Sequence, residues 1–275
     1  MKYSAINIQG NIITSDILEK IRREDIRYQK PIDFGLNPTS SVRDEISLAW
    51  SLASSHWKAF QQKREGLRET DTGTTETRRM WLIPFLQLLG YDISVANAEI
   101  INGKSYAISH RATNLDGFPI HIVGVNQKLD TKNEGARLSP HALGQEYLNN
   151  HEHLYALVSN GKSLRLLRDA TLLSRLSFVE FDLQRMMEEN LYAEFALLYR
   201  FLHASRLPKK IEDAPDCFLE FYHVESLASG SRIRERLSQA VEISIKDLAN
   251  GLLSHPNNKE LRELILNDQI IAKDF

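Results

Sequence analysis

The stretch LDGFPIHIVGVNQKLD, residues 115–130, places an acidic residue before a short apolar segment and an amide-rich polar segment after it. Asp116-Gly117 is typical of a turn, and FPIHIVG has the β-branched, largely apolar composition of a buried strand. The pattern therefore predicts a central strand whose apolar side chains lie beneath a helix further back in the chain. The residues expected to meet are Ile120, Ile122 and Val125 on the strand, and Phe85 and Leu89 on the helix.

An Asp before a strand that ends in Glu-x-Lys is the layout of metal-dependent nucleases of the PD-(D/E)xK class. Two carboxylates hold Mg²⁺ there, and the Lys orients the attacking water. Asn126 stands where that Glu belongs, and its neutral carbonyl oxygen predicts weak Mg²⁺ binding. The catalytic positions on this interpretation are Asp116, Asn126, Gln127 and Lys128, with Asp116 and Glu76 as weak metal ligands and Glu99 or Asp130 as substitutes.

A plainer interpretation of the same residues stays open. Asp116-Gly117 is then a turn, Asn126-Gln127 is a strand end, and Lys128 is solvated. If the nuclease-like interpretation holds, Asp116 and Asn126 are expected near each other at the rim of the sheet, with Lys128 close by. Even then we expect no bound metal and no cleavage by this chain alone, because only one formal negative charge would face the ion.

The flanking sequence predicts an α/β domain of three layers with a mixed sheet. Helical spacing covers residues 42–64 and 77–91, and Ser139-Pro140 is a helix start. Short strand-like segments are separated by turn residues, and Asn160-Gly161 is typical of a two-residue hairpin turn. The expected strands are 106–110, 118–126, 153–160, 162–170 and 177–183, followed by a helix at 191–205 and a helical tail that His255-Pro256 interrupts.

Composition restricts the class of protein. The 275 residues carry a net charge of -2 and contain one cysteine, Cys217, so an internal disulfide and a cysteine-based zinc site are excluded. The start shows no signal-peptide pattern and no apolar run is long enough to span a bilayer, which predicts a soluble cytoplasmic protein without membrane partners. DNA contact would need a local basic surface, for which the candidates are Arg78, Arg79, Lys162, Arg165 and Arg168.

The residue pattern gives little support for other kinds of catalytic or metal centre. His141, His151 and His153 lack a third ligand at metal-binding spacing, so they are interpreted as ordinary histidines. Cys217 stands beside Phe218 and is interpreted as a small buried hydrophobe. GxGxxG and GxxxxGKS loops are absent, which argues against nucleotide binding by this chain.

Several segments together resemble the N-terminal region of large bacterial type IIG-like restriction–modification adenine methylases, which also occur in phage-defence loci. They include GNIITSDILEKI, TRRMWLIPFLQLLGY, PIHIVG, SPHALGQEYLNNHEHLYALVSNGKSLRLLRD and LANGLLSHPNNKELR. The resemblance spans nearly the whole chain and implies a restriction-endonuclease-like fold at residues 42–207, an N-terminal arm at 1–41 and a helical connector at 208–275. It also suggests a second alignment, in which Gly124 occupies the Glu position and Asn126 the Lys position.

The methylase half of that family, with its Asn-Pro-Pro-Tyr motif and S-adenosylmethionine site, has no counterpart in this sequence. The resemblance therefore implies that methylation, and its cofactor, belong to a fused or partner methylase. The primary functional hypothesis is a catalytically degenerate nuclease-like module that binds DNA or docks a methylase. The alternatives are an active Mg²⁺-dependent DNA endonuclease and a protein–protein assembly domain without DNA contact.

Overall fold

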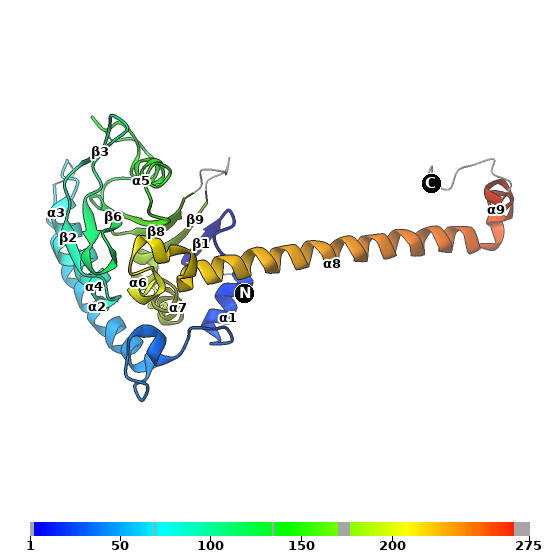
Figure 1. Cartoon of the computed structure of the whole chain (residues 1–275), viewed down its shortest axis with the longest axis horizontal. Coiled ribbons are helices and arrows are strands. Elements are labelled where there is room, and N and C mark those ends of the chain that lie inside the picture. Colours follow the sequence, from blue (N-terminus) through cyan, green and yellow to red (C-terminus); the bar gives the residue numbers. More distant parts are fainter. Residues whose placement is uncertain (1–2, 69, 134, 170–176, 267–275) are drawn as a thin grey trace. The chain divides into compact units, whose positions relative to one another are not determined.

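The computed structural model describes residues 3–68, 70–133, 135–169 and 177–266 (Figure 1). The chain forms two compact units, residues 1–227 and 228–275. The strands are β1 (Ile6–Gln9), β2 (Ile93–Val95), β3 (Glu99–Ile101), β4 (Lys104–Tyr106), β5 (His110–Ala112), β6 (Phe118–Ile122), β7 (Tyr155–Ser159), β8 (Ser163–Arg168) and β9 (Phe178–Asp182). The α-helices are α1 (Ser15–Arg22), α2 (Val42–Glu65), α3 (Thr74–Glu76), α4 (Ile83–Leu88), α5 (Pro140–Leu148), α6 (Leu183–Glu188), α7 (Tyr192–Leu202), α8 (Phe218–Ser254) and α9 (Lys259–Leu266).

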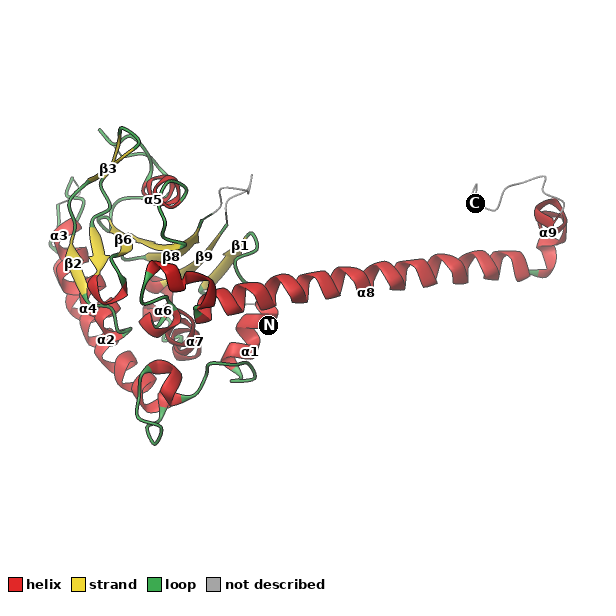
Figure 2. Ribbon diagram, viewed as in Figure 1, coloured by secondary structure: helices red, strands yellow, loops and turns green. Residues whose placement is uncertain are grey.

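A seven-stranded mixed sheet with the order β1-β9-β8-β7-β6-β5-β2 forms the centre of the first unit (Figure 2). β6 runs parallel to β7, which it reaches through α5, whereas the pairs β5–β6, β7–β8 and β8–β9 are antiparallel. All five residues of β6 and of β7 are buried, as expected for interior strands covered on both faces. The predicted α/β class with a mixed sheet is confirmed.

The two faces of the sheet carry separate apolar cores. Ile120 and Ile122 of β6 pack with Phe85 and Leu89 in the larger core, together with Val125, which follows the strand. The prediction that the three strand residues are buried in a core shared with the helix that holds Phe85 and Leu89 is therefore confirmed. The opposite face contributes Val158 and its neighbours to a smaller core under α5. Figure 2 shows α5 on one side of the strands and α2, α4, α6 and α7 on the other.

Sequence periodicity placed most helices and the central strands correctly, but it misplaced one strand and did not predict β1, β2 or β3. Ser139 caps α5 by accepting a hydrogen bond from the backbone N–H of Ala142, and Pro140 is the first residue of the helix, as predicted. Residues 106–110 were expected to form one strand, but β4 ends at Tyr106 and β5 begins at His110. The two ends of that segment pair with different partners, β3 and β6, so the chain breaks between them.

Residues 74–88 form one continuous helical segment whose hydrogen-bonding geometry changes along its length. α3 leads into a π-helical segment, Thr77–Leu82, and then into α4. Gly90 lies just beyond, with φ +84°, a conformation that glycine adopts without steric cost and that commonly ends a helix. The helix stop predicted at Gly90 is confirmed. π-helical turns are rare and occur often at functional sites, which directs attention to this segment.

The predicted arm and connector boundaries differ from the folded units. The first 41 residues supply β1, which pairs with β9 at the sheet edge, so they belong to the main fold. The first unit continues past the predicted boundary at Leu207 to Leu227, because residues such as Leu219 and Tyr222 join its core. The predicted helical tail and its interruption at His255-Pro256 are both present as α8, a short 3-10 turn and α9. Within the described ranges no helix combines the length and apolarity required to cross a bilayer.

Candidate functional site

The segment after β6, where a nuclease of this layout would hold its metal, is closed by residues 71–74. The backbone N–H of Asn126 donates to the carbonyl oxygen of Thr72 at 3.2 Å, and the Asn126 side-chain amide donates to the Asp71 carbonyl at 2.8 Å. A Cβ atom added at Gly124 would lie 2.1 Å from the Thr72 carbonyl oxygen. Backbone therefore occupies the space that a side chain at Gly124 would need.

Asp116 lies at the other end of β6. It adopts a left-handed conformation, φ +50°, in the turn that precedes the strand, and its Oδ2 accepts a hydrogen bond from the backbone N–H of Ile211 at 3.1 Å. The five residues of β6 separate this turn from Asn126, and a strand of that length spans roughly 16 Å. The prediction that Asp116 and Asn126 lie near each other is therefore wrong, because the D-x9-N spacing extends along the strand.

The remaining predicted carboxylates do not converge either. Glu99 is paired with Arg111 at 2.6 Å, and Asp130 is paired with Arg165 at 2.5 Å. Glu76 is partly exposed in α3. Among the described residues there is no group of three His, Cys, Asp or Glu side chains placed to hold a metal ion. Lys128 is exposed to solvent, and Gln127 Oε1 accepts a hydrogen bond from the backbone N–H of Gly124. Both positions are ordinary for a surface lysine and a loop glutamine.

Replacing Asn126 with Glu is expected to leave Mg²⁺ binding unchanged. The new carboxylate would stand alone beside the Asp71 carbonyl, while Mg²⁺ gives up its hydration shell reluctantly and needs several oxygen ligands in octahedral positions. Isothermal titration of the variant and of the parent chain with MgCl₂ measures this. A saturable heat seen only in the variant would contradict the placement of Asp116 and Asn126 described above.

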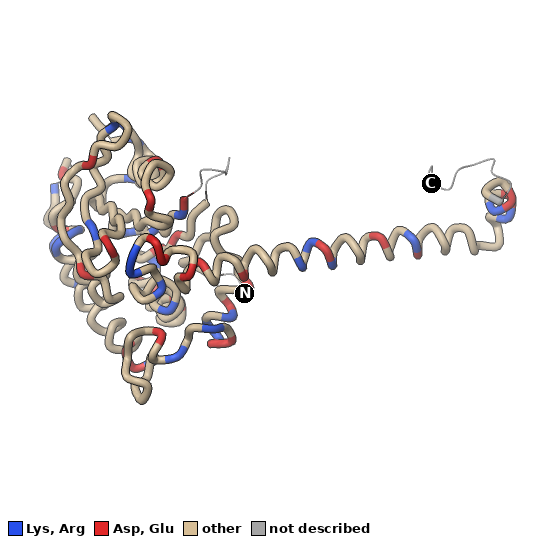
Figure 3. Tube along the Cα trace, viewed as in Figure 1, with Lys and Arg blue, Asp and Glu red and all other residues tan. Residues whose placement is uncertain are grey.

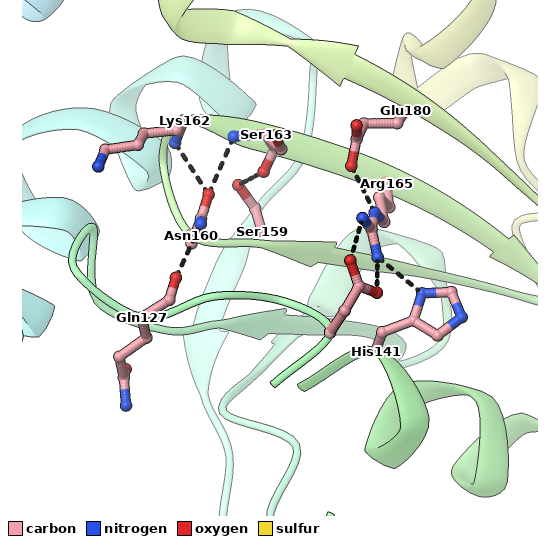
Figure 4. A network of polar contacts seen from close by, with 9 residues as sticks. Gln127, His141, Ser159, Asn160, Lys162, Ser163, Arg165 and Glu180 are labelled. Carbon is pink, nitrogen blue, oxygen red and sulfur yellow. Dashed lines mark hydrogen bonds and ion pairs between the residues drawn. The ribbon is translucent and has the colours of Figure 1, made fainter. Parts of the chain in front are cut away.

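Arg165 on β8 is the centre of a buried polar network rather than part of a free basic face (Figure 4). Its guanidinium donates to both carboxylate oxygens of Asp130, at 2.5 and 2.7 Å, and to Oε2 of Glu180 at 2.5 Å. His141 Nδ1 lies 3.3 Å from Nη1, and the Phe178 ring lies 4.4 Å from the guanidinium carbon. Burial acts to lower the pKa of Arg165, but the two carboxylates outweigh it and raise the pKa, so the side chain stays charged.

Arg168, another predicted DNA-binding residue, is also neutralised internally. Its guanidinium donates to Glu220 of α8 at 2.8 Å, and Tyr155 donates to the same carboxylate at 2.6 Å. The alternation of basic and leucine residues in β8 had suggested one solvent-facing basic surface. In the structure Asp130 and Glu180 neutralise Arg165, and Glu220 of α8 neutralises Arg168, so neither side chain is presented to a ligand.

The turn between β7 and β8 is held in place by Asn160. Its side-chain oxygen accepts from the backbone N–H groups of Lys162 and Ser163, at 3.0 and 2.9 Å, and its amide donates to the Gln127 carbonyl at 2.8 Å (Figure 4). The hairpin is confirmed, but its turn lies one residue later than predicted. Ser159 pairs with Leu164, and the backbone N–H of Asn160 donates to the Ser163 carbonyl at 3.3 Å, so the turn is centred on Gly161 and Lys162 and the Asn160 side chain stabilises it.

Four cations gather where this turn meets the end of β6, and we call them the edge cations: Arg64, Arg78, Lys128 and Lys162. Arg78 donates through Nε and Nη2 to the Ile122 carbonyl, at 3.0 and 2.6 Å. Trp81, one turn further along, donates to the Gly161 carbonyl at 2.8 Å and so fixes the helix against the turn. Lys128 follows Gln127, the residue to which Asn160 is anchored.

Within the part of the chain that the structure describes, none of the edge cations forms an ion pair. Burial, and then the charge of Arg64, lower the pKa of Lys162, and burial lowers the pKa of Arg78. Burial and the Arg78 charge also lower the pKa of His110 and of His121 to about 4, so both are neutral at neutral pH. The edge cations therefore form a local cluster of positive charge. Elsewhere in the chain, Lys and Arg residues are interspersed with Asp and Glu residues (Figure 3).

A second polar cluster, which sequence analysis did not anticipate, surrounds Glu99. Its carboxylate accepts from Arg111 at 2.6 Å and from the Tyr147 hydroxyl at 3.1 Å. His151 stacks on Tyr147, and its Nδ1 lies 2.9 Å from Nδ1 of His153. Burial lowers the pKa of His153 to about 4, so its ring is neutral at neutral pH. The members come from four separate segments, and no local spacing in the sequence marks them.

A cleft of about 740 Å³ runs between residues 32–35 and 203–218. Among the residues that line it are His203 and Cys217. Burial lowers the pKa of His203 to about 4 and raises that of the Cys217 thiol to about 11. At neutral pH the thiol is protonated and the imidazole is neutral, so this pair lacks the thiolate–imidazolium character of a cysteine nucleophile.

The comparisons with known proteins add no relative. No protein-family model, curated protein or solved structure matches the chain.

Proposed function

We propose that the chain is a non-cleaving, nuclease-like module that docks on DNA phosphates through the edge cations. The observation that carries the proposal is the group of four unpaired cations at the end of β6 and the β7–β8 turn. Unpaired Lys and Arg side chains on one edge are what phosphate contact requires, and such contacts position a protein without reading sequence. Arg79, which follows Arg78 in the chain, is exposed as well.

The same edge argues against cleavage by this chain. In the nuclease layout the metal would lie where Asn126 is tied to Asp71 and where Thr72 backbone covers Gly124. Phosphate contact without a metal positions DNA but supplies neither a nucleophile nor leaving-group stabilisation. Among the described residues, no group of three His, Cys, Asp or Glu side chains is placed to hold the metal that the active-endonuclease alternative needs.

A restriction-endonuclease-like fold and a role in bacterial restriction–modification or phage defence belong to this proposal. Both are supported by the sequence resemblance and by the order helix, strands, helix, strand, strand, which the structure contains as α4, β5–β6, α5, β7 and β8. On this proposal, a fused or partner adenine methylase methylates DNA with S-adenosylmethionine. This chain binds the DNA or the methylase and positions it for that reaction.

Replacing Lys128 and Lys162 together with Gln is expected to weaken binding to a short DNA duplex about tenfold or more at low salt. Loss of two phosphate contacts should also reduce the slope of log affinity against log salt by about 2. Fluorescence anisotropy across a salt series measures both quantities, and thermal melts confirm that the variant is folded.

The matched control removes two positive charges from another surface. Arg22 and Arg23 on α1 are paired with Glu19, so changing both to Gln alters net charge equally but removes no edge cation. Equal losses in the two double variants would reduce the effect to net charge and reject a local interface. Magnesium-dependent nicking of a plasmid by the parent chain, abolished in Asp116→Ala, would favour the endonuclease alternative instead.

A further inference from the structure

Two histidines in the loop between α5 and β7 face each other through the same ring nitrogen. Nδ1 of His151 lies 2.9 Å from Nδ1 of His153, whereas the ring centres are 4.7 Å apart, so the two nitrogens form the contact. The other nitrogen of each ring has a partner of its own. Nε2 of His153 lies 3.2 Å from the Asp116 carbonyl oxygen, and Nε2 of His151 lies 3.8 Å from Oε2 of Glu99.

The contacts of this pair require one more proton than two neutral rings carry. A neutral imidazole has one N–H and one lone pair. The Asp116 carbonyl only accepts, so it requires the His153 proton on Nε2, and the backbone N–H of His153 donates to Nδ1 of His151 at 3.3 Å. With both contacts satisfied, the two Nδ1 atoms present lone pairs to each other. Moving the proton of either ring to Nδ1 satisfies that contact only by breaking another. A cation that accepts both lone pairs removes the conflict.

We propose that His151 and His153 bind one divalent transition-metal ion through their Nδ1 atoms, with water completing its coordination. Histidines that bind metal usually donate their second ring N–H to a carboxylate or a backbone carbonyl, and Glu99 and Asp116 supply these two acceptors here. The side chains of His151 and Glu99 are 25% and 40% exposed, so the pair is not sealed from solvent. The site has two protein ligands, one fewer than the groups of three that are absent from the described residues.

The charges around the two rings favour a cation. The carboxylates of Glu99 and Glu152 favour positive charge on the first ring, and that of Asp116 favours it on the second. Arg111 opposes them, but its guanidinium is itself paired with Glu99 at 2.6 Å. Three carboxylates and one guanidinium leave a net negative charge beside the two histidines.

The distance between the two nitrogens indicates which ions fit. Bonds between metal and imidazole are about 2.0–2.1 Å long, so nitrogens 2.9 Å apart subtend about 90° at the ion. Tetrahedral Zn²⁺ would need them about 3.3 Å apart. Neighbouring positions of a square-planar or tetragonal complex match better, and Cu²⁺ and Ni²⁺ prefer these geometries. Coordination releases the backbone N–H of His153, whose hydrogen bond at 3.3 Å is longer than usual.

Isothermal titration of the full chain with NiCl₂ alone tests the site. The parent chain should bind one Ni²⁺, and His151→Gln and His153→Gln should each weaken binding about tenfold or more, because even losing an outer hydrogen-bond partner of a ligand typically costs about 10–100-fold. Glutamine keeps a polar atom near the position of Nε2 and removes Nδ1, so the contacts with Glu99 and Asp116 remain possible. Thermal melts without metal check that both variants are folded. MgCl₂ should give no saturable heat, because Mg²⁺ prefers oxygen ligands.

His255→Gln is the matched control. His255 is exposed, and its Nδ1 accepts from the backbone N–H two residues later at 3.3 Å, the same local contact that His151 makes. This variant should bind Ni²⁺ like the parent chain. Electron paramagnetic resonance of the parent with one equivalent of Cu²⁺ should show two coordinated imidazole nitrogens. A parent chain without saturable Ni²⁺ binding would overturn the proposal, as would binding that persists in both other glutamine variants or is lost equally in His255→Gln.

Discussion

Replacing Arg206 with Ala is expected to lower the free energy of unfolding by about 4 kcal/mol, with Arg206→Met costing about 2–3 kcal/mol. Arg206 is fully buried, and its guanidinium lies 4.0 Å from the centre of the Phe34 ring and 4.8 Å from that of Phe218. Its two terminal nitrogens donate to the carbonyl oxygens of Tyr28 and Asp33. Chemical denaturation of each variant gives the unfolding free energies.

The expected loss has two separable causes. The first is the pair of carbonyl oxygens, which lose charge-assisted donors when the guanidinium is removed. The second is the apolar stem, which fills the space between the two rings and is replaced by a void in the alanine variant. Met restores most of the stem but none of the donors, so the difference between the two variants measures packing. Burial lowers the pKa of Arg206, and removing this buried charge offsets part of the loss in both variants, so the methionine figure is smaller because Met keeps most of the apolar stem.

An exposed arginine provides the comparison. Arg185→Ala removes an exposed surface pair with Glu189 and is expected to leave the unfolding free energy nearly unchanged. If Arg206→Ala cost no more than Arg185→Ala, the buried guanidinium would not be what holds residues 28–33 against the main fold.

Sequence analysis placed correctly those elements that are determined by interactions between residues close together in the sequence. Ser139 and Pro140 start a helix because the cap accepts from an N–H three residues later and the ring suits the first turn. Val42–Glu65 is a helix with one apolar face, and its buried residues repeat at helical spacing. The buried FPIHI strand likewise follows from its own composition.

The candidate site depends on contacts between distant segments, and the sequence alone does not show them. Alternation in β8 predicted one basic and one apolar face, which is wrong, because Leu164 and Leu166 enter the larger core and Leu167 enters the smaller one. Nor did it show that Asp130, from 35 residues earlier, would neutralise Arg165. The edge cations were only partly anticipated: Arg78 and Lys162 were named as basic candidates and Lys128 as a catalytic one, whereas Arg64 joins them from α2 through folding. Residues 71–74 close the end of β6 from about 50 residues away, and nothing near Gly124 in the sequence indicates this.

Gly124 offers the clearest test of whether the end of β6 is closed. Both Gly124→Ala and Gly124→Glu are expected to lose about 3 kcal/mol of unfolding free energy, because any Cβ would lie 2.1 Å from the Thr72 carbonyl oxygen and 2.7 Å from its carbon. These are backbone atoms tied by the hydrogen bond from Asn126, so relief requires moving the loop. Gly66→Ala is the matched control, because its Cβ would make only an ordinary contact at 3.6 Å.

The Glu variant also tests whether Gly124 occupies the position of a lost metal-binding Glu or is simply a closely packed glycine. If Gly124 occupies the lost Glu position of a nuclease, a carboxylate restored there should bind Mg²⁺ and the cost of the Glu change should fall as MgCl₂ is added, because a ligand that binds only the folded state stabilises it. We expect no such recovery, since Asp116 lies beyond the far end of β6 and cannot share the ion. Equal losses for Ala and Glu, with and without Mg²⁺, would show that sterics alone govern this position. A Glu variant rescued by Mg²⁺, with the Ala variant unaffected, would show instead that the loop can open onto a nuclease-like metal site.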